Sequence, residues 1–225
     1  MQTVPIPQGL STLRAIMLGK LQRIWSLSFY EKLNLAQLWY YRMKGKMFYR
    51  RVFKSFGKDS AIYPPTLIGN PQYITIGDRV TIRNGVRLEA VMLDPKNPPE
   101  IRIGNNVNIE QDVHIVAVGK VHIHDDVSIT ARVCLLGGTH PFFDIHNPVK
   151  IGNRLDGAES LLEIGEGSFL GVGCTLQMNV RLGKRVVVGS NSVVKKSFPD
   201  DCVVDGNPAA VVLQYNAEEG RWKRS

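Results

Sequence analysis

The sequence predicts an all-β solenoid, a parallel coil of hexapeptide repeats that follows an N-terminal helical arm. Aliphatic residues return at every sixth position, a smaller residue usually stands four places further on, and Gly, Asn and Asp crowd the positions between. A period of six is too long for the alternation of one strand and does not match a 3.6-residue helix. It suits a coil with three short flat sides. The repeating positions are Ile76, Ile82, Leu88, Ile103, Ile109, Ile115, Ile123, Ile129, Leu135, Ile164, Leu170, Leu176, Leu182, Val188 and Val194.

Two interruptions of the repeat predict loops. The first, at about residues 89–100, contains three prolines, and the second, at about residues 140–160, follows Thr139. Long loops on a rigid scaffold usually carry binding chemistry. We therefore expect a basic, aromatic arm over residues 1–60, a coil over residues 61–213 with these two insertions, and a basic tail over residues 214–225.

Composition favours one compact domain. The chain has 225 residues, of which 44% are hydrophobic. Its three cysteines are an odd number, so they cannot all pair in a disulfide framework. No apolar run approaches the length of about 20 residues that a membrane span needs. The first residues also lack the basic region of a signal peptide. These features predict a cytoplasmic protein.

The positive charge is concentrated in the arm. Residues 1–60 hold 11 basic and 2 acidic side chains, whereas the rest of the chain holds 17 and 18. The arm also carries many aromatic residues, and apolar residues recur in it at helical spacing: Leu10, Leu13, Met17, Leu21, Ile24 and Leu27. Such a segment fits either a cap over the first coil or peripheral contact with an anionic membrane. Nucleic-acid binding is not expected.

The end of the repeat carries a specific motif. Val193-Val194-Lys195-Lys196-Ser197-Phe198-Pro199, followed by Val204-Asp205-Gly206-Asn207-Pro208-Ala209, resembles the closing signature of the hexapeptide-repeat acyltransferases. The resemblance covers roughly residues 60–213. It implies a left-handed parallel β-helix and a homotrimer with its sites between neighbouring subunits.

Within this family, Thr139-His140-Pro141 is similar to the short His-Pro sequence that carries the catalytic histidine of sugar and polysaccharide O-acetyltransferases. The resemblance implies that His140 is the general base, because a free alcohol is too weak a nucleophile to attack a thioester unaided. Its orienting partner stays open between Asp144, Asp156, Glu159 and a backbone carbonyl. Backbone N–H groups near Gly171-Val172-Gly173 are candidates for stabilising the oxyanion.

The resemblance also implies acetyl-CoA as co-substrate. The cofactor positions of the family fall on Gly171, Val172, Gly189, Ser190, Lys195 and Lys196. The lysine pair suits the phosphates of the nucleotide. The saccharide acceptor is expected near Asn108, Glu110 and His114. Two departures concern the nucleotide contacts: Phe169-Leu170 replaces a common Trp-Ile, and Ala210 replaces a basic residue.

No metal is expected, because His114, His122, His124, His140 and His146 do not reproduce the ligand spacing of the carbonic anhydrases built on similar solenoids. The sequence therefore predicts O-acetylation of a sugar hydroxyl in cell-surface polysaccharide biosynthesis, on an acceptor that can be lipid-linked. Two alternatives remain open: N-acetylation of a nucleotide-linked amino sugar, and a non-catalytic solenoid scaffold.

Overall fold

The computed structural model describes residues 25–224, and the chain divides into one unit up to Tyr40 and a second from Tyr41 onward. Helix α2 (Phe29–Lys44) begins with a capping box, in which the Ser28 N–H donates to Glu31 Oε2 at 2.7 Å and the Glu31 N–H donates to Ser28 Oγ at 3.2 Å. None of its residues is buried by the described part of the chain. No helix within residues 25–224 is long and apolar enough to cross a bilayer. The apolar positions from Leu10 to Ile24 lie outside the described residues.

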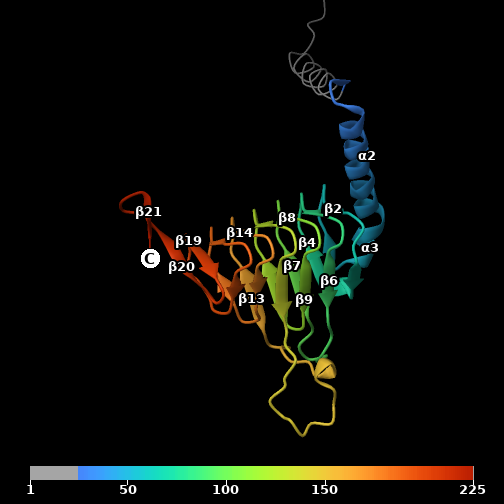
Figure 1. Ribbon diagram of the computed structural model, residues 1–225. Coiled ribbons are helices and arrows are strands. Elements are labelled where there is room, and N and C mark those ends of the chain that lie inside the picture. Colours follow the sequence, from blue (N-terminus) through green and yellow to red (C-terminus); the bar gives the residue numbers. More distant parts are fainter. Residues whose placement is uncertain (1–24, 225) are drawn as a thin grey trace, which may run out of the picture. The chain divides into compact units, whose positions relative to one another are not determined.

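The second unit is a coil of three sheets that consecutive strands enter in turn (Figure 1). The first sheet contains β1 (Ser55–Phe56), β4 (Ile74–Ile76), β7 (Glu100–Ile103), β10 (Lys120–Ile123), β13 (Leu161–Ile164) and β16 (Arg181–Leu182). The second contains β2 (Ala61–Ile62), β5 (Thr81–Ile82), β8 (Asn108–Ile109), β11 (Ser128–Ile129), β14 (Phe169–Leu170), β17 (Val187–Val188), β19 (Cys202–Gly206), β20 (Ala209–Asn216) and β21 (Arg221–Arg224). The third contains β3 (Leu67–Gly69), β6 (Arg87–Ala90), β9 (His114–Ala117), β12 (Cys134–Gly137), β15 (Thr175–Leu176) and β18 (Val193–Val194).

The aliphatic residues of the hexapeptide repeat are buried inside this coil. Every aliphatic residue that the repeat singles out is at most 2% exposed. Ile103 pairs in parallel register with Ile76 on one side and Ile123 on the other, so like positions stack from coil to coil. Each such side chain contributes roughly 1.5–3 kcal/mol of transfer free energy when fully buried. The prediction of a three-sided coil from a six-residue period is therefore confirmed.

The Asn and Asp residues between the hexads connect one coil to the next. The Lys58 N–H donates to Asp78 Oδ1 at 2.7 Å, the Asp78 N–H donates to Asn105 Oδ1 at 2.9 Å, and the Asn105 N–H donates to Asp125 Oδ1 at 2.7 Å. An Asp or Asn side chain of each coil thus accepts a hydrogen bond from a backbone N–H group of the preceding coil.

The coil extends beyond both boundaries that the sequence predicts. Strand β1 lies within the segment assigned to the arm, and β20 and β21 add an antiparallel hairpin to the second sheet where a tail is expected. The N-terminal end is covered by η1 (Gly45–Tyr49), a π-helix, and α3 (Arg50–Val52). Tyr49, Phe53 and Phe56 are buried there, with ring centroids 5.4–5.7 Å apart. A cap over the first coil is therefore made by the end of the predicted arm.

Both insertions leave the coil at the same corner, between the third and the first sheet. Residues 91–99 connect β6 to β7, and residues 138–160, which contain the short helix η3 (Ile151–Asn153), connect β12 to β13. Between them, β9 passes to β10 through Val118 and Gly119 alone. Figure 1 shows the longer loop projecting from one edge of the stacked strands. The two insertions are therefore separated by one coil with a tight turn.

Candidate active site

The base of the longer loop is held by a pair of backbone hydrogen bonds directly before His140. The Thr139 N–H donates to the Asp156 carbonyl at 3.0 Å, and the Asp156 N–H donates to the Thr139 carbonyl at 2.9 Å. Gly138 permits this approach, since a Cβ there would lie 3.1 Å from the Asp156 carbonyl oxygen and 2.3 Å from Val118 Cγ2. On the far side, Ser160 Oγ donates to the Gly137 carbonyl at 3.0 Å. His140 therefore starts from a fixed point on the coil.

The imidazole of His140 is oriented by a backbone carbonyl. Its Nδ1 lies 2.6 Å from the Arg154 carbonyl oxygen. Because a carbonyl oxygen only accepts hydrogen bonds, Nδ1 carries the proton and Nε2 keeps its lone pair. Of the orienting partners considered from the sequence, the carbonyl is the one that the structure places there. The side chain of His140 is exposed, so Nε2 is accessible to a substrate.

Arg154 also holds the loop together through its side chain. Its guanidinium donates to three backbone carbonyls: to Val149 from Nε at 2.7 Å, to Asp144 from Nη1 at 2.9 Å and to Asn147 from Nη2 at 2.8 Å. The five donors of an arginine in one plane make such multiple contacts feasible. One residue therefore orders the loop and, through its own carbonyl, orients His140. Nothing in the sequence singles out Arg154, because its partners are main-chain atoms that carry no residue signature.

The rest of the loop exposes apolar side chains. Phe142 and Phe143 stack on each other with ring centroids 4.4 Å apart. Phe143 is 85% exposed and Ile145 is 83% exposed, although both are large hydrophobic residues. Contiguous apolar side chains on a surface loop are typical of a segment that contacts another molecule.

The glycines expected to bind the cofactor are required by the coil itself. A Cβ on Gly171 would lie 2.7 Å from both Ser190 N and the Val188 carbonyl oxygen, and one on Gly189 would lie 2.3 Å from Asp205 Oδ1. The Gly171 N–H donates to Val188, and the Gly173 N–H donates to Ala131. These two N–H groups are already engaged, so stabilisation of an oxyanion would fall to other N–H groups near this corner and stays a prediction. Val172 and Ser190 stand at the same corner, between the second and the third sheet.

Lys195 and Lys196 lie at a different corner, directly after β18. Both are exposed, and neither ammonium group forms an ion pair with the described residues. The ammonium group of Lys196 lies 5.6 Å from the centroid of the Phe198 ring. Two exposed, unpaired lysines fit a phosphate-bearing ligand.

The residues expected near the acceptor are not brought next to His140 within one chain. Asn108 is in the second sheet and Glu110 follows it at the next corner, where Arg83 Nε lies 3.9 Å from its carboxylate. His114 begins β9 in the third sheet and pairs with Cys134, at the opposite end of the strand from the loop. Burial, and then the charge of Arg87, lower the pKa of His114.

None of the three cysteines is disulfide-bonded. Burial raises the pKa of the Cys174 thiol to about 12, and burial also raises the pKa of Cys202. Since the thiolate is the nucleophile, such thiols are inert near neutral pH. His122 and His124 lie on the outer face of the first sheet, bonded to Glu100 at 3.0 Å and to Glu163 at 2.8 Å. Within residues 25–224, no group of three or more His, Cys, Asp or Glu side chains could hold a metal ion.

Comparison with known proteins gives the family. No family model matches the chain. The chain is 30% identical over 165 residues to WbbJ of Escherichia coli strain K12, whose name assigns it to lipopolysaccharide biosynthesis as an O-acetyl transferase; the match covers 72% of this chain and 82% of WbbJ. It is 27% identical over 139 residues to WcaF of the same organism, whose name assigns it to colanic acid biosynthesis as an acetyltransferase, covering 62% of this chain and 68% of WcaF.

The solved structures agree in fold. A crystal structure of AntD, an N-acyltransferase from Bacillus cereus, superposes with a TM-score of 0.60 at 20% identity and covers 74% of this chain and 87% of AntD. Parallel sheets wound from hexads, a His-Pro loop and the similarity to WbbJ define the class together. The chain belongs to the hexapeptide-repeat acetyltransferases. It is therefore an acyltransferase.

Proposed function

We propose that this protein transfers an acetyl group from acetyl-CoA to a sugar hydroxyl in cell-surface polysaccharide biosynthesis, with His140 as the general base. The observation that carries the proposal is the bond between His140 Nδ1 and the Arg154 carbonyl, because it leaves Nε2 as a free base. The names of WbbJ and WcaF support a polysaccharide acceptor.

In the proposed reaction, the thioester supplies an activated acetyl group and the protein supplies the base. As the hydroxyl oxygen of the acceptor bonds to the acetyl carbon, Nε2 of His140 takes the hydroxyl proton. When the carbon–sulfur bond breaks, the leaving sulfur takes that proton back from the imidazolium. Throughout, the Arg154 carbonyl holds the Nδ1 proton and stabilises the imidazolium. The buried, high-pKa thiol of Cys174 favours direct transfer over a covalent enzyme intermediate.

Acetyl-CoA is proposed to lie along the coil at Gly171, Val172, Gly189 and Ser190, with its phosphates near Lys195 and Lys196. The exposed, unpaired lysines support this placement, because phosphate oxygens favour cationic partners. The AntD structures support a CoA thioester as the donor, since they are complexes with CoA or 3-hydroxybutyryl-CoA.

A left-handed coil and a homotrimer belong to the same proposal. Asn108, Glu110 and His114 stand on other parts of the coil surface than His140. In a trimer with sites between subunits, these residues of one copy can face the loop of its neighbour. The exposed Phe143 and Ile145 support such a contact, because they leave apolar surface that a second copy would cover.

Peripheral contact of the arm with the inner face of the cell membrane is also proposed. Helix α2 exposes Phe29, Tyr30, Trp39 and Tyr40, each by more than half of its surface. The basic excess of residues 1–60 would attract anionic headgroups, and aromatic side chains suit the membrane interface.

The test of the proposed activity is acceptor-dependent release of free CoA from acetyl-CoA, measured with a panel of neutral sugars and amino sugars. His140→Ala is expected to lower the rate by about 10² to 10⁴-fold, the contribution of a positioned base. His146→Ala is the matched control, since His146 is an exposed histidine of the same loop. Equal activity of His140→Ala and wild type would overturn the proposal. Preference for a primary amine would favour N-acetylation of an amino sugar, and absence of CoA binding would favour a scaffold.

A further inference from the structure

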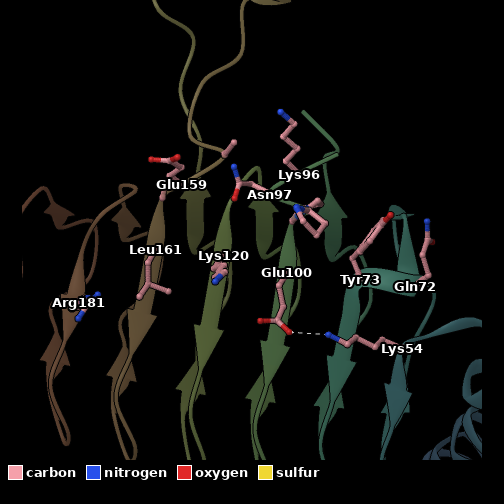
Figure 2. Close-up of a pocket in the computed structure, with 14 residues that line it drawn as sticks. Lys54, Gln72, Tyr73, Lys96, Asn97, Glu100, Lys120, Glu159, Leu161 and Arg181 are labelled. Carbon is pink, nitrogen blue, oxygen red and sulfur yellow. Dashed lines mark hydrogen bonds and ion pairs between the residues drawn. The ribbon is translucent and has the colours of Figure 1, made fainter. Parts of the chain in front are cut away.

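A cleft of about 810 Å³ lies on the outer face of the first sheet, between the two insertions (Figure 2). Its floor is formed by successive strands, on which Lys120 pairs in register with Glu100 on one side and Leu161 on the other. Residues 96–99 of the shorter insertion form one wall, and residues 158–160 of the longer insertion form the other. This volume is typical of a small-molecule site.

The cleft carries an excess of positive charge. Its lining includes Lys54, Lys96, Lys120 and Arg181 against two carboxylates, Glu100 and Glu159. Within the described chain, the ammonium groups of Lys96 and Lys120 form no hydrogen bond or ion pair. Figure 2 shows Lys96 on the loop above the strands and Lys120 on a strand of the sheet.

The main carboxylate of the floor is already neutralised. Glu100 accepts from Lys54 Nζ at 3.1 Å and from Arg102 Nη2 at 3.1 Å, and it lies 3.0 Å from His122 Nε2. The Glu100 side chain is only 15% exposed, and its negative charge is shared by these three partners. The lysines without partners are therefore not balanced by Glu100.

The cleft is continuous with the base of the His140 loop. An adjoining hollow of about 540 Å³ shares Asn97, Ala158, Glu159 and Ser160 with it. That hollow is also lined by Asp156, whose backbone pairs with Thr139, the residue before His140. A ligand seated on the lysines can thus extend along one surface towards the catalytic loop.

We propose that this cleft binds the phosphate or pyrophosphate group of a phosphorylated saccharide, the acceptor of the acetyl transfer. The inference rests on the proposed function and adds the substrate class. A neutral sugar needs no unpaired ammonium groups, whereas phosphate oxygens form short, charge-assisted bonds with them. A nucleoside diphosphate sugar and a lipid pyrophosphate sugar share this chemistry.

Binding is tested by calorimetry on the full chain without acetyl-CoA. The probes are inorganic pyrophosphate, a nucleoside diphosphate sugar and the same sugar without phosphate. The double variant Lys96→Gln/Lys120→Gln is expected to weaken binding of both phosphorylated probes by at least about tenfold, because charged hydrogen bonds are lost. Binding of the neutral sugar is expected to change little. The control Lys46→Gln/Lys58→Gln removes the same charge from exposed positions outside the cleft lining.

Equal binding of the phosphorylated probes by the cleft variant and wild type would overturn the inference, and so would the absence of binding to wild type. CoA release with His140→Ala is measured separately, so loss of the activity leaves the binding result interpretable. If the cleft variant keeps the wild-type KM for phosphorylated acceptors while His140→Ala is inactive, the proposed activity stands and the cleft is not its acceptor site. The phosphate can belong to a nucleoside diphosphate sugar or to a lipid pyrophosphate sugar. The rate of CoA release with each of them, the lipid-linked sugar being supplied in vesicles, shows which one is the acceptor.

Discussion

At the scale of single residues, the bond between His140 and the Arg154 carbonyl determines which imidazole nitrogen can act as a base. The carbonyl cannot donate, so Nδ1 must. A carboxylate partner would have fixed the same tautomer and added a negative charge beside the imidazolium. Here the orientation depends on the backbone of a loop, and therefore on whatever keeps that loop ordered.

Arg154→Ala is expected to lower kcat by roughly tenfold to a hundredfold, because small misplacements of a catalytic group carry losses of that size. The KM for acetyl-CoA is expected to stay near the wild-type value, since Arg154 contacts only the loop. Arg154→Lys should recover part of kcat through its remaining donors. Steady-state kinetics of the three proteins make the comparison. An unchanged kcat, or a rise in KM alone, would contradict a positioning role.

At the scale of elements, the outer face of the first sheet carries charges in register across several coils. Burial favours the neutral form of Glu100, but hydrogen bonds from Lys54, His122 and Arg102 outweigh it and lower its pKa to about 2. A carboxylate with a lowered pKa stabilises the folded state above its unfolded pKa of 4.5. That stabilisation is lost as the pH falls through the folded value.

The free energy of unfolding of the wild type is therefore expected to fall between pH 4.5 and pH 2 by about 1–3 kcal/mol more than that of Glu100→Gln. Urea denaturation at several pH values within this window measures the difference. Glu166→Gln is the control, because the Lys184–Glu166 pair is exposed and screened by solvent. If the free energies of unfolding of wild type and Glu100→Gln fall in parallel with pH, the bonds of Glu100 to Lys54, His122 and Arg102 do not stabilise the sheet.

At the scale of the whole molecule, the two units make separate contributions. Removal of residues 1–40 is expected to weaken sedimentation with anionic vesicles, since it removes the exposed aromatic residues of α2 up to Tyr40. The thermal midpoint of the coil is expected to stay unchanged, because α2 contributes no buried residue and the aromatic cap begins at Gly45. Zwitterionic vesicles provide the control for wild type.

Equal binding of the shortened chain to anionic vesicles would contradict the membrane proposal. A lower thermal midpoint would indicate instead that the removed residues support the coil. The two readouts therefore separate the two interpretations of the arm that the sequence leaves open.

The parts of the coil that the sequence predicts are those with a regular period. In the first coil, strand β1 was missed, although Phe56 continues the six-residue spacing of Ile62 and Ile68 and pairs with Ile76. An aromatic residue at its first position hid the pattern. The terminal hairpin was also missed, because β20 and β21 leave the hexapeptide period and pair antiparallel.

The sequence by itself determined the coil, its buried positions, the two insertions and the family, since a six-residue period is a local pattern that each hexad repeats. Only the tertiary structure decided the partner of His140, the clamp by Arg154 and the unpaired lysines of the cleft. These depend on backbone atoms and on charges that different coils bring together, such as Lys54 and Glu100. A backbone acceptor has no residue identity, and a charge has no partner until the register of the coils is set.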